Sequence, residues 1–120
     1  MALRINDTIP DLTVETDQGS FSLHDWIGDS WAILFSHPKD FTPVCTTELS
    51  AFAADKEWFA QHNTKLIGLS IDSIHYHLAW VNNVREKTGV YMDFPIIADL
   101  DMSVAHLYGM LHPGENTTAA

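Results

Sequence analysis

The chain's single cysteine, Cys45, lies in the segment SHPKDFTPVCTTELS (residues 36–50), which Pro38 and Pro43 interrupt. A thiol reacts as its thiolate, and a free cysteine with a pKa of about 8.5 is mostly protonated at neutral pH. Pro43 suits the first position of a helix because it has no N–H group to leave unpaired. A helix that starts at Pro43 or Val44 puts Cys45 in its first turn, where unpaired N–H groups and the helix dipole favour negative charge. The segment therefore predicts a reactive thiol.

Thr42 falls at the N-cap of this predicted helix. Glu48 lies six residues further on, too far to form a capping box with Thr42. The threonine hydroxyl is therefore free to turn toward the sulfur or a bound substrate. A lone cysteine is, however, usually a small buried hydrophobic side chain. The prolines and the helix start make these two interpretations of Cys45 about equal, and spacing alone does not separate them.

Alternating apolar runs and amphipathic segments predict the elements that must position Cys45. We expect strands over residues 11–16, 31–37, 64–72 and 94–99, and helices over residues 22–28, 44–63, 73–89 and 102–110. The compact apolar run WAILFSH (31–37) is typical of a strand buried on both faces. The alternation predicts an α/β domain with parallel strands and right-handed crossovers. Because such a sheet needs protected edges, we expect a terminal strand or two to be missing from the sequence.

Length and charge limit the classes of function. The 120 residues fit one domain, and 16 acidic against 6 basic residues give a net charge of −10. Such a surface repels phosphate backbones and anionic lipids, which argues against binding of nucleic acid or membranes. The chain has no signal-peptide run and no apolar stretch of membrane-spanning length. A single cysteine forms no internal disulfide, so we expect a cytoplasmic protein.

The segment PKDFTPVCTTE resembles the P-x-x-x-T-x-x-C motif of the peroxiredoxins, with Pro38, Thr42 and Cys45 in the three defined positions. Further stretches are similar to the one-cysteine, peroxiredoxin-six type of this family. They are KLIGLSIDS, HLAWVNNV, FPIIAD and YGMLHP. The resemblance covers residues 5–114 and implies a thioredoxin-like fold. That fold is a three-layer sandwich around a central mixed sheet, here lacking its last strands, in one incomplete domain over residues 1–120.

The resemblance implies a thiol-dependent peroxidase that reduces hydrogen peroxide and small organic hydroperoxides. Cys45 would be the peroxidatic cysteine, which attacks the hydroperoxide and becomes a sulfenic acid. Thr42 would hydrogen-bond the peroxide, and Pro38 would shield the pocket and limit overoxidation. His37 matches a histidine that the subfamily keeps near the thiolate, where it donates a hydrogen bond or lowers the thiol pKa. From its position alone, His37 is equally well explained as the cap of a strand end.

The resemblance also implies partners. An external thiol, either glutathione or another small thiol or redoxin, would recycle the sulfenic acid, and no metal, flavin or nucleotide cofactor is required. The full-length family members form homodimers. They also carry an active-site arginine on a strand after the YGML segment, a position that this chain, which ends at Ala120, does not reach.

Two other functions compete with peroxidase activity. A thioredoxin-fold redox sensor or binding module would share the first oxidation step of Cys45 but not its turnover. A weaker alternative is a serine-dependent lipid hydrolase that uses Ser30 and His24, positions that match those of phospholipase members of the subfamily. The nucleophile elbow needs a strand-to-helix turn, whereas Ser30 precedes a predicted strand, so a turn with a capping serine is favoured.

The remaining histidines and aromatic residues suggest no cofactor. His75 and His77 are two apart on a predicted helix and diverge, so we expect surface or loop histidines rather than a metal site. We expect the large aromatic residues to face the core. These are Trp26, Trp31, Trp58, Phe59 and Trp80.

Overall fold

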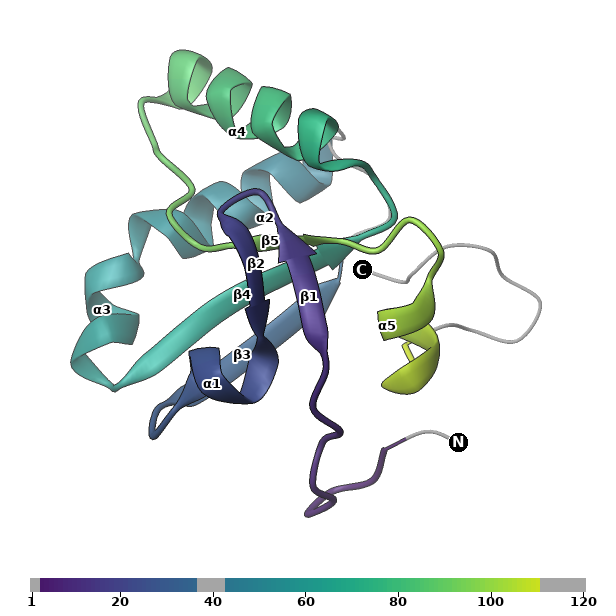
Figure 1. Ribbon diagram of the computed structural model, residues 1–120. Coiled ribbons are helices and arrows are strands. Elements are labelled where there is room, and N and C mark those ends of the chain that lie inside the picture. The colour runs from purple at the N-terminus through teal and green to yellow at the C-terminus, as the bar shows by residue number, and fades with distance from the viewer. Residues whose placement is uncertain (1–2, 37–42, 111–120) are drawn as a thin grey trace.

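The computed structural model describes residues 3–36 and 43–110, and for residues 43–46 it describes the backbone alone. Within these residues a central five-stranded sheet has the strand order β2-β1-β5-β4-β3. The elements, in chain order, are β1 (Thr13–Thr16), β2 (Gly19–Ser22), α1 (Leu23–Ile27), β3 (Trp31–Ser36), α2 (Pro43–Ala54), α3 (Lys56–Gln61), β4 (Thr64–Ser70), α4 (Ile74–Thr88), β5 (Ile96–Ala98) and α5 (Ser103–Leu107) (Figure 1).

The sheet is mixed. Strands β3, β4 and β5 run parallel to one another, as the alternation of strands and helices predicts. Strand β1 pairs antiparallel with both β2 and β5. The four-residue strand β2 is missing from our sequence prediction, which assigned only a turn at Gly19 and a helix from Ser22.

Helices cover both faces of the sheet, which makes three layers (Figure 1). On one face, α2 and α4 bury an apolar cluster that includes Leu49, Trp80 and Val84 against Leu66 of β4. On the other face, α1 and α5 pack against Ile67 and neighbouring residues of the sheet. Adjacent residues of β4 thus enter opposite cores, because successive side chains of a strand point to opposite faces.

The predicted helix boundaries at α1 and α4 are confirmed. The Ser22 side chain accepts a hydrogen bond from the Asp25 N–H, and α1 ends at Gly28. The Ser73 hydroxyl accepts from the Tyr76 N–H at 3.2 Å and caps α4. This helix ends at Gly89, whose φ of 75° is left-handed and favours glycine.

Three sequence predictions are wrong in detail. The helix expected over residues 44–63 is divided at Asp55, whose ψ of 16° departs from the helical value of about −42°. Strand β3 is not buried on both faces, because it is the edge of the described sheet, and Trp31 and Ile33 are 76% and 40% exposed. Trp58 also lies outside the core and is 56% exposed, since it projects from the short surface helix α3.

Among the residues that the structure describes, none of the helices is both long enough and apolar enough to cross a membrane.

Candidate active site

Cys45 is the third residue of α2, which begins at Pro43. The predicted helix start is therefore confirmed, and the Cys45 backbone lies in the first turn, where N–H groups have no partner within the helix. The other three predicted site residues, His37, Pro38 and Thr42, lie outside the described residues. Their roles stay predictions.

Strand β3, which precedes α2 in the chain, ends at the carboxyl edge of the three parallel strands. Ser36 ends β3 beside Leu69 of β4, and Ser70 ends β4 beside Ala98 of β5. The three strands thus end nearly level. In open α/β sheets, ligands bind outside this carboxyl edge, so Cys45 follows the edge at which a substrate is expected.

Aromatic packing docks α2 on the sheet. The ring of Phe52 stacks on Phe35 of β3, with centroids 5.4 Å apart, and Phe35 contacts Phe94 edge-on at the same centroid distance. Leu49 and Ala53 of α2 are buried in the same core. These contacts hold the helix that carries Cys45 in a defined place over β3 and β4.

Gly68 of β4 lies against the Phe35 ring. A Cβ atom at this position would lie 3.3 Å from the Phe35 ring and 3.7 Å from Ile96. The first distance is closer than ordinary van der Waals contact. The glycine therefore provides the space into which Phe35 fits.

A buried carboxylate, Asp99, lies just after β5 at the same carboxyl edge. It accepts hydrogen bonds from the backbone N–H groups of Val104 at 3.0 Å and Ala105 at 2.9 Å. The Ser103 hydroxyl donates a longer one of 3.4 Å, and the Asp99 N–H donates to the Ser70 carbonyl at 2.9 Å. These bonds satisfy the N–H groups of the second and third residues of α5, so Asp99 has a structural role. This role was not predicted from the sequence, although an acidic residue between a buried strand and a short helix is typical of such a cap.

Tyr108 ties the end of α5 to the N-terminal segment. Its hydroxyl donates a 2.6 Å hydrogen bond to the Pro10 carbonyl. Burial of the phenol, with a smaller contribution from the nearby charge of Asp11, raises the pKa of Tyr108 to about 12. The Asp11 carboxylate accepts a hydrogen bond from the His24 N–H, which lowers the pKa of Asp11.

The geometry of Ser30 and His24 does not favour hydrolase chemistry. Ser30 lines an apolar cavity of about 590 Å³, but its hydroxyl donates to the Ile27 carbonyl at 2.6 Å. The His24 ring donates from Nε2 to the Ile9 carbonyl at 2.8 Å. Each side chain is bound to a separate backbone carbonyl, and Ser30 precedes strand β3 rather than a helix. A capping serine in a turn explains these contacts.

One histidine differs from the predicted surface position. His77 is fully buried on α4, and its Nε2 donates to the Ile97 carbonyl at 3.1 Å. It diverges from the exposed His75 as expected. In the part of the chain that the structure describes, His, Cys, Asp and Glu side chains form no group of three that could hold a metal ion.

A mixed sheet covered by helices on both faces, with a cysteine in the first turn of the helix after a parallel strand, defines a thioredoxin-like thiol protein. Residues 5–119 match the AhpC/TSA family. The chain belongs to this family, as the resemblance at Pro38, Thr42 and Cys45 predicted.

The one-cysteine type is also supported. The chain is 47% identical to the 1-Cys peroxiredoxin of Dictyostelium discoideum over 116 residues, which cover 97% of this chain and 48% of that protein. It is 48% identical to peroxiredoxin-6 of Gallus gallus, covering 94% of this chain and 52% of the relative. The chain thus spans about half the length of these curated relatives.

Solved structures confirm the thioredoxin-like fold. The yeast mitochondrial 1-Cys peroxiredoxin, whose thiol is resolved through glutathione/thioredoxin systems, superposes with a TM-score of 0.87 at 45% identity. The match covers 98% of this chain and 54% of that one. Peroxiredoxin 6 of Arenicola marina matches with a TM-score of 0.88 at 38% identity over 96% of this chain and 53% of its own.

Proposed function

We propose that this chain belongs to a thiol-dependent peroxidase that reduces hydrogen peroxide and small organic hydroperoxides through Cys45. The observation that carries the proposal is the start of α2 at Pro43, which puts Cys45 in the first turn of a twelve-residue helix. The helix dipole and the unpaired N–H groups of this turn stabilise a thiolate relative to a thiol. The sequence identity to one-cysteine peroxiredoxins supports the same assignment.

The Cys45 sulfur is the only redox centre that the protein contributes to this reaction. The Cys45 thiolate attacks the terminal oxygen of the hydroperoxide, the O–O bond breaks, and the leaving oxygen takes a proton to become water or an alcohol. The sulfur is oxidised to a sulfenic acid. One external thiol then forms a mixed disulfide with release of water, and a second thiol releases the reduced cysteine.

In the proposed reaction, three further residues assist Cys45. The Thr42 hydroxyl binds the peroxide, Pro38 shields the pocket and limits overoxidation, and His37 donates a hydrogen bond or positive charge near the thiolate. The motif match at Pro38, Thr42 and Cys45 supports the first two roles, and the role of His37 rests on its resemblance to a histidine of the subfamily.

The partners follow from the chemistry and the relatives. We expect an external thiol reductant, either glutathione or another small thiol or redoxin, because the yeast relative is resolved through glutathione/thioredoxin systems. We also propose one peroxiredoxin domain over residues 1–120, a homodimer for the full-length protein, and a cytoplasmic location, although one relative at 48% identity is mitochondrial.

Peroxide consumption in the presence of a thiol reductant tests the proposal. The wild-type chain, within its full-length protein, should consume many equivalents of hydrogen peroxide, and Cys45→Ser should consume none. Ser30→Ala is the matched control and should retain activity. Consumption that stops at one equivalent would instead indicate a sensor, and activity retained in Cys45→Ser would contradict the mechanism.

A further inference from the structure

A second cavity, of about 280 Å³, lies at the opposite end of α2 from Cys45. Ala53, near the end of the helix, and Thr64, Lys65 and Leu66, at the start of β4, contribute to its lining. Eight residues of helix separate Cys45 from Ala53, a rise of about 12 Å. The cavity is therefore distinct from the candidate active site, which follows the carboxyl end of β3.

Flat apolar side chains form much of the cavity lining. Phe59 of α3, Phe94 before β5 and Trp26 of α1 line the cavity together with the buried Leu66 of β4. Ligand sites typically combine such apolar walls with a few polar groups that fix the orientation of the ligand. The size of the cavity suits a small molecule with one ring or a short alkyl chain.

The charge of the lining is opposite to that of the whole chain. Two of the six basic residues, Lys56 and Lys65, line the cavity, and Asp93 is the one acidic residue among the lining residues. The lining therefore carries an excess of one positive charge, whereas the chain carries a net charge of −10. Low-dielectric walls increase the attraction of such a site for an anion.

Lys65 is held at the rim of the cavity. Its ammonium group donates a hydrogen bond to the Trp26 carbonyl and lies 5.2 Å from the centroid of the Trp26 ring. The backbone bond and the cation–π contact together fix the position of the charge. An ammonium group has three donors, so the bond to Trp26 leaves donors for a bound anion.

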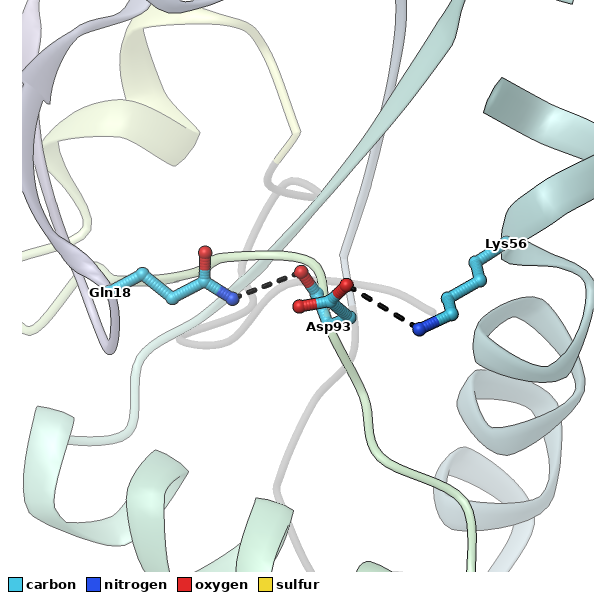
Figure 2. A network of polar contacts seen from close by, with 3 residues as sticks. All are labelled: Gln18, Lys56 and Asp93. Atoms are coloured by element: carbon cyan, nitrogen blue, oxygen red, sulfur yellow. Dashed lines mark hydrogen bonds and ion pairs between the residues drawn. The ribbon is translucent and has the colours of Figure 1, made fainter. Parts of the chain in front are cut away.

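Lys56 is held more weakly. Its Nζ lies 3.7 Å from an Asp93 carboxylate oxygen, and both side chains are 56% exposed. The Gln18 amide donates to the backbone carbonyl of Asp93 at 3.1 Å, which leaves the carboxylate to face Lys56 (Figure 2). A long, exposed ion pair of this kind is weak, so a ligand carboxylate can compete with Asp93 for Lys56.

We propose that this cavity binds a small monoanion with a flat apolar body, such as an aryl carboxylate. The apolar part packs against Phe59 and Phe94, and the carboxylate accepts hydrogen bonds from Lys65 and Lys56. The ligand displaces the Asp93 carboxylate from Lys56. The site is independent of peroxide reduction at Cys45.

The competing explanation is that the Gln18, Asp93 and Lys56 contacts only fasten the β1–β2 turn and α3 to the chain before β5. The two explanations differ in the effect of Asp93→Asn. Removing this charge frees Lys56 and raises the positive excess of the cavity, while the Gln18 bond to the backbone carbonyl stays. Asp93→Asn should therefore tighten anion binding if the cavity is a binding site.

Titration of the protein with 4-fluorobenzoate, followed by fluorine NMR, tests the proposal. We expect saturable binding that weakens roughly tenfold in Lys65→Met, because a charge-assisted hydrogen bond is lost. Binding should tighten in Asp93→Asn and remain unchanged in the control Lys87→Met, which alters an exposed lysine of α4 outside the cavity. The neutral isostere 4-fluorobenzamide should bind far more weakly.

Several results would overturn the proposal. The first is that 4-fluorobenzoate shows no saturable binding, and the second is that the neutral amide binds equally tightly. The others are that Lys87→Met weakens binding as much as Lys65→Met does, or that Asp93→Asn does not tighten binding. The effect of Asp93→Asn on binding tests the proposal even if Lys65→Met fails to fold. Because the readout is binding, the result does not depend on peroxidase activity.

Discussion

Phe35 of β3 stacks on Phe52 of α2, with ring centroids 5.4 Å apart and an interplanar angle of 11°. This contact joins the strand that leads into the candidate active site to the helix that leaves it. The position of Cys45 therefore depends on how well the two rings fit over the sheet. The fit in turn depends on Gly68, which has no side chain to displace Phe35.

Gly68→Ala should destabilise the fold by about 1–3 kcal/mol, because the added methyl group would lie 3.3 Å from the Phe35 ring, whose contacts with Phe52 and Phe94 restrict its movement away. Urea denaturation gives the free energy of unfolding. Phe35→Leu should lose packing by itself but absorb the new methyl group in the double variant. Independent, additive losses in this double-mutant cycle would show that the two side chains do not compete for the same space.

Asp99→Asn should loosen α5 at its start. The asparagine keeps one acceptor oxygen, whereas the carboxylate accepts from both Val104 and Ala105 through separate oxygens. We expect a loss of about 1–3 kcal/mol, typical of a buried donor left unsatisfied. Amide hydrogen exchange should accelerate at Val104 and Ala105. Asp29→Asn is the control, because Asp29 is an exposed residue far from α5, and equal effects of the two variants would contradict the role of Asp99.

Alkaline pH should destabilise the protein through Tyr108. Its pKa is raised from 10.0 to about 12 in the folded state, chiefly by burial. The unfolded chain therefore loses this proton first, so the stabilisation is complete below pH 10 and is lost as the pH rises toward 12. Tyr108→Phe should remove this part of the pH dependence, measured by denaturation at pH 8 to 11. If the stability of Tyr108→Phe depends on pH in the same way as that of the wild type, a group other than Tyr108 causes this dependence.

If Thr42 binds the peroxide as proposed, Thr42→Val should slow the first oxidation of Cys45 by roughly tenfold, because the substitution removes the hydroxyl that makes this contact. Thr42→Ser keeps the hydroxyl and should largely preserve the rate. Stopped-flow measurement of sulfenic acid formation compares the two variants. If they behave alike, the hydroxyl does not position the peroxide.

Local signals in the sequence predicted much of the fold. Ser73 and Gly89 define the ends of α4 because an N-cap hydroxyl and a left-handed glycine act within a few residues of the helix. The start of α2 at Pro43 was predictable for the same reason. The Pro38, Thr42 and Cys45 spacing likewise identified the family, which the match over residues 5–119 confirms.

Features that depend on distant residues were not predictable in this way. The exposure of Trp31 follows from the place of β3 at the edge of the described sheet, which its apolar composition does not reveal. The burial of His77 depends on the carbonyl of Ile97, twenty residues away. The cavity beside Lys65 joins five separate segments of the chain, so no single motif marks it.

The central claim is that the start of α2 activates the Cys45 thiol. The most direct test is the rate at which Cys45 forms a sulfenic acid with micromolar hydrogen peroxide. The product is trapped with a sulfenic-specific reagent and located by mass spectrometry, both in this chain and in the full-length protein. We expect a rate orders of magnitude above that of free cysteine, and no product in Cys45→Ser. A rate equal to that of free cysteine in the full-length protein would contradict the assignment of Cys45 as a peroxidatic residue.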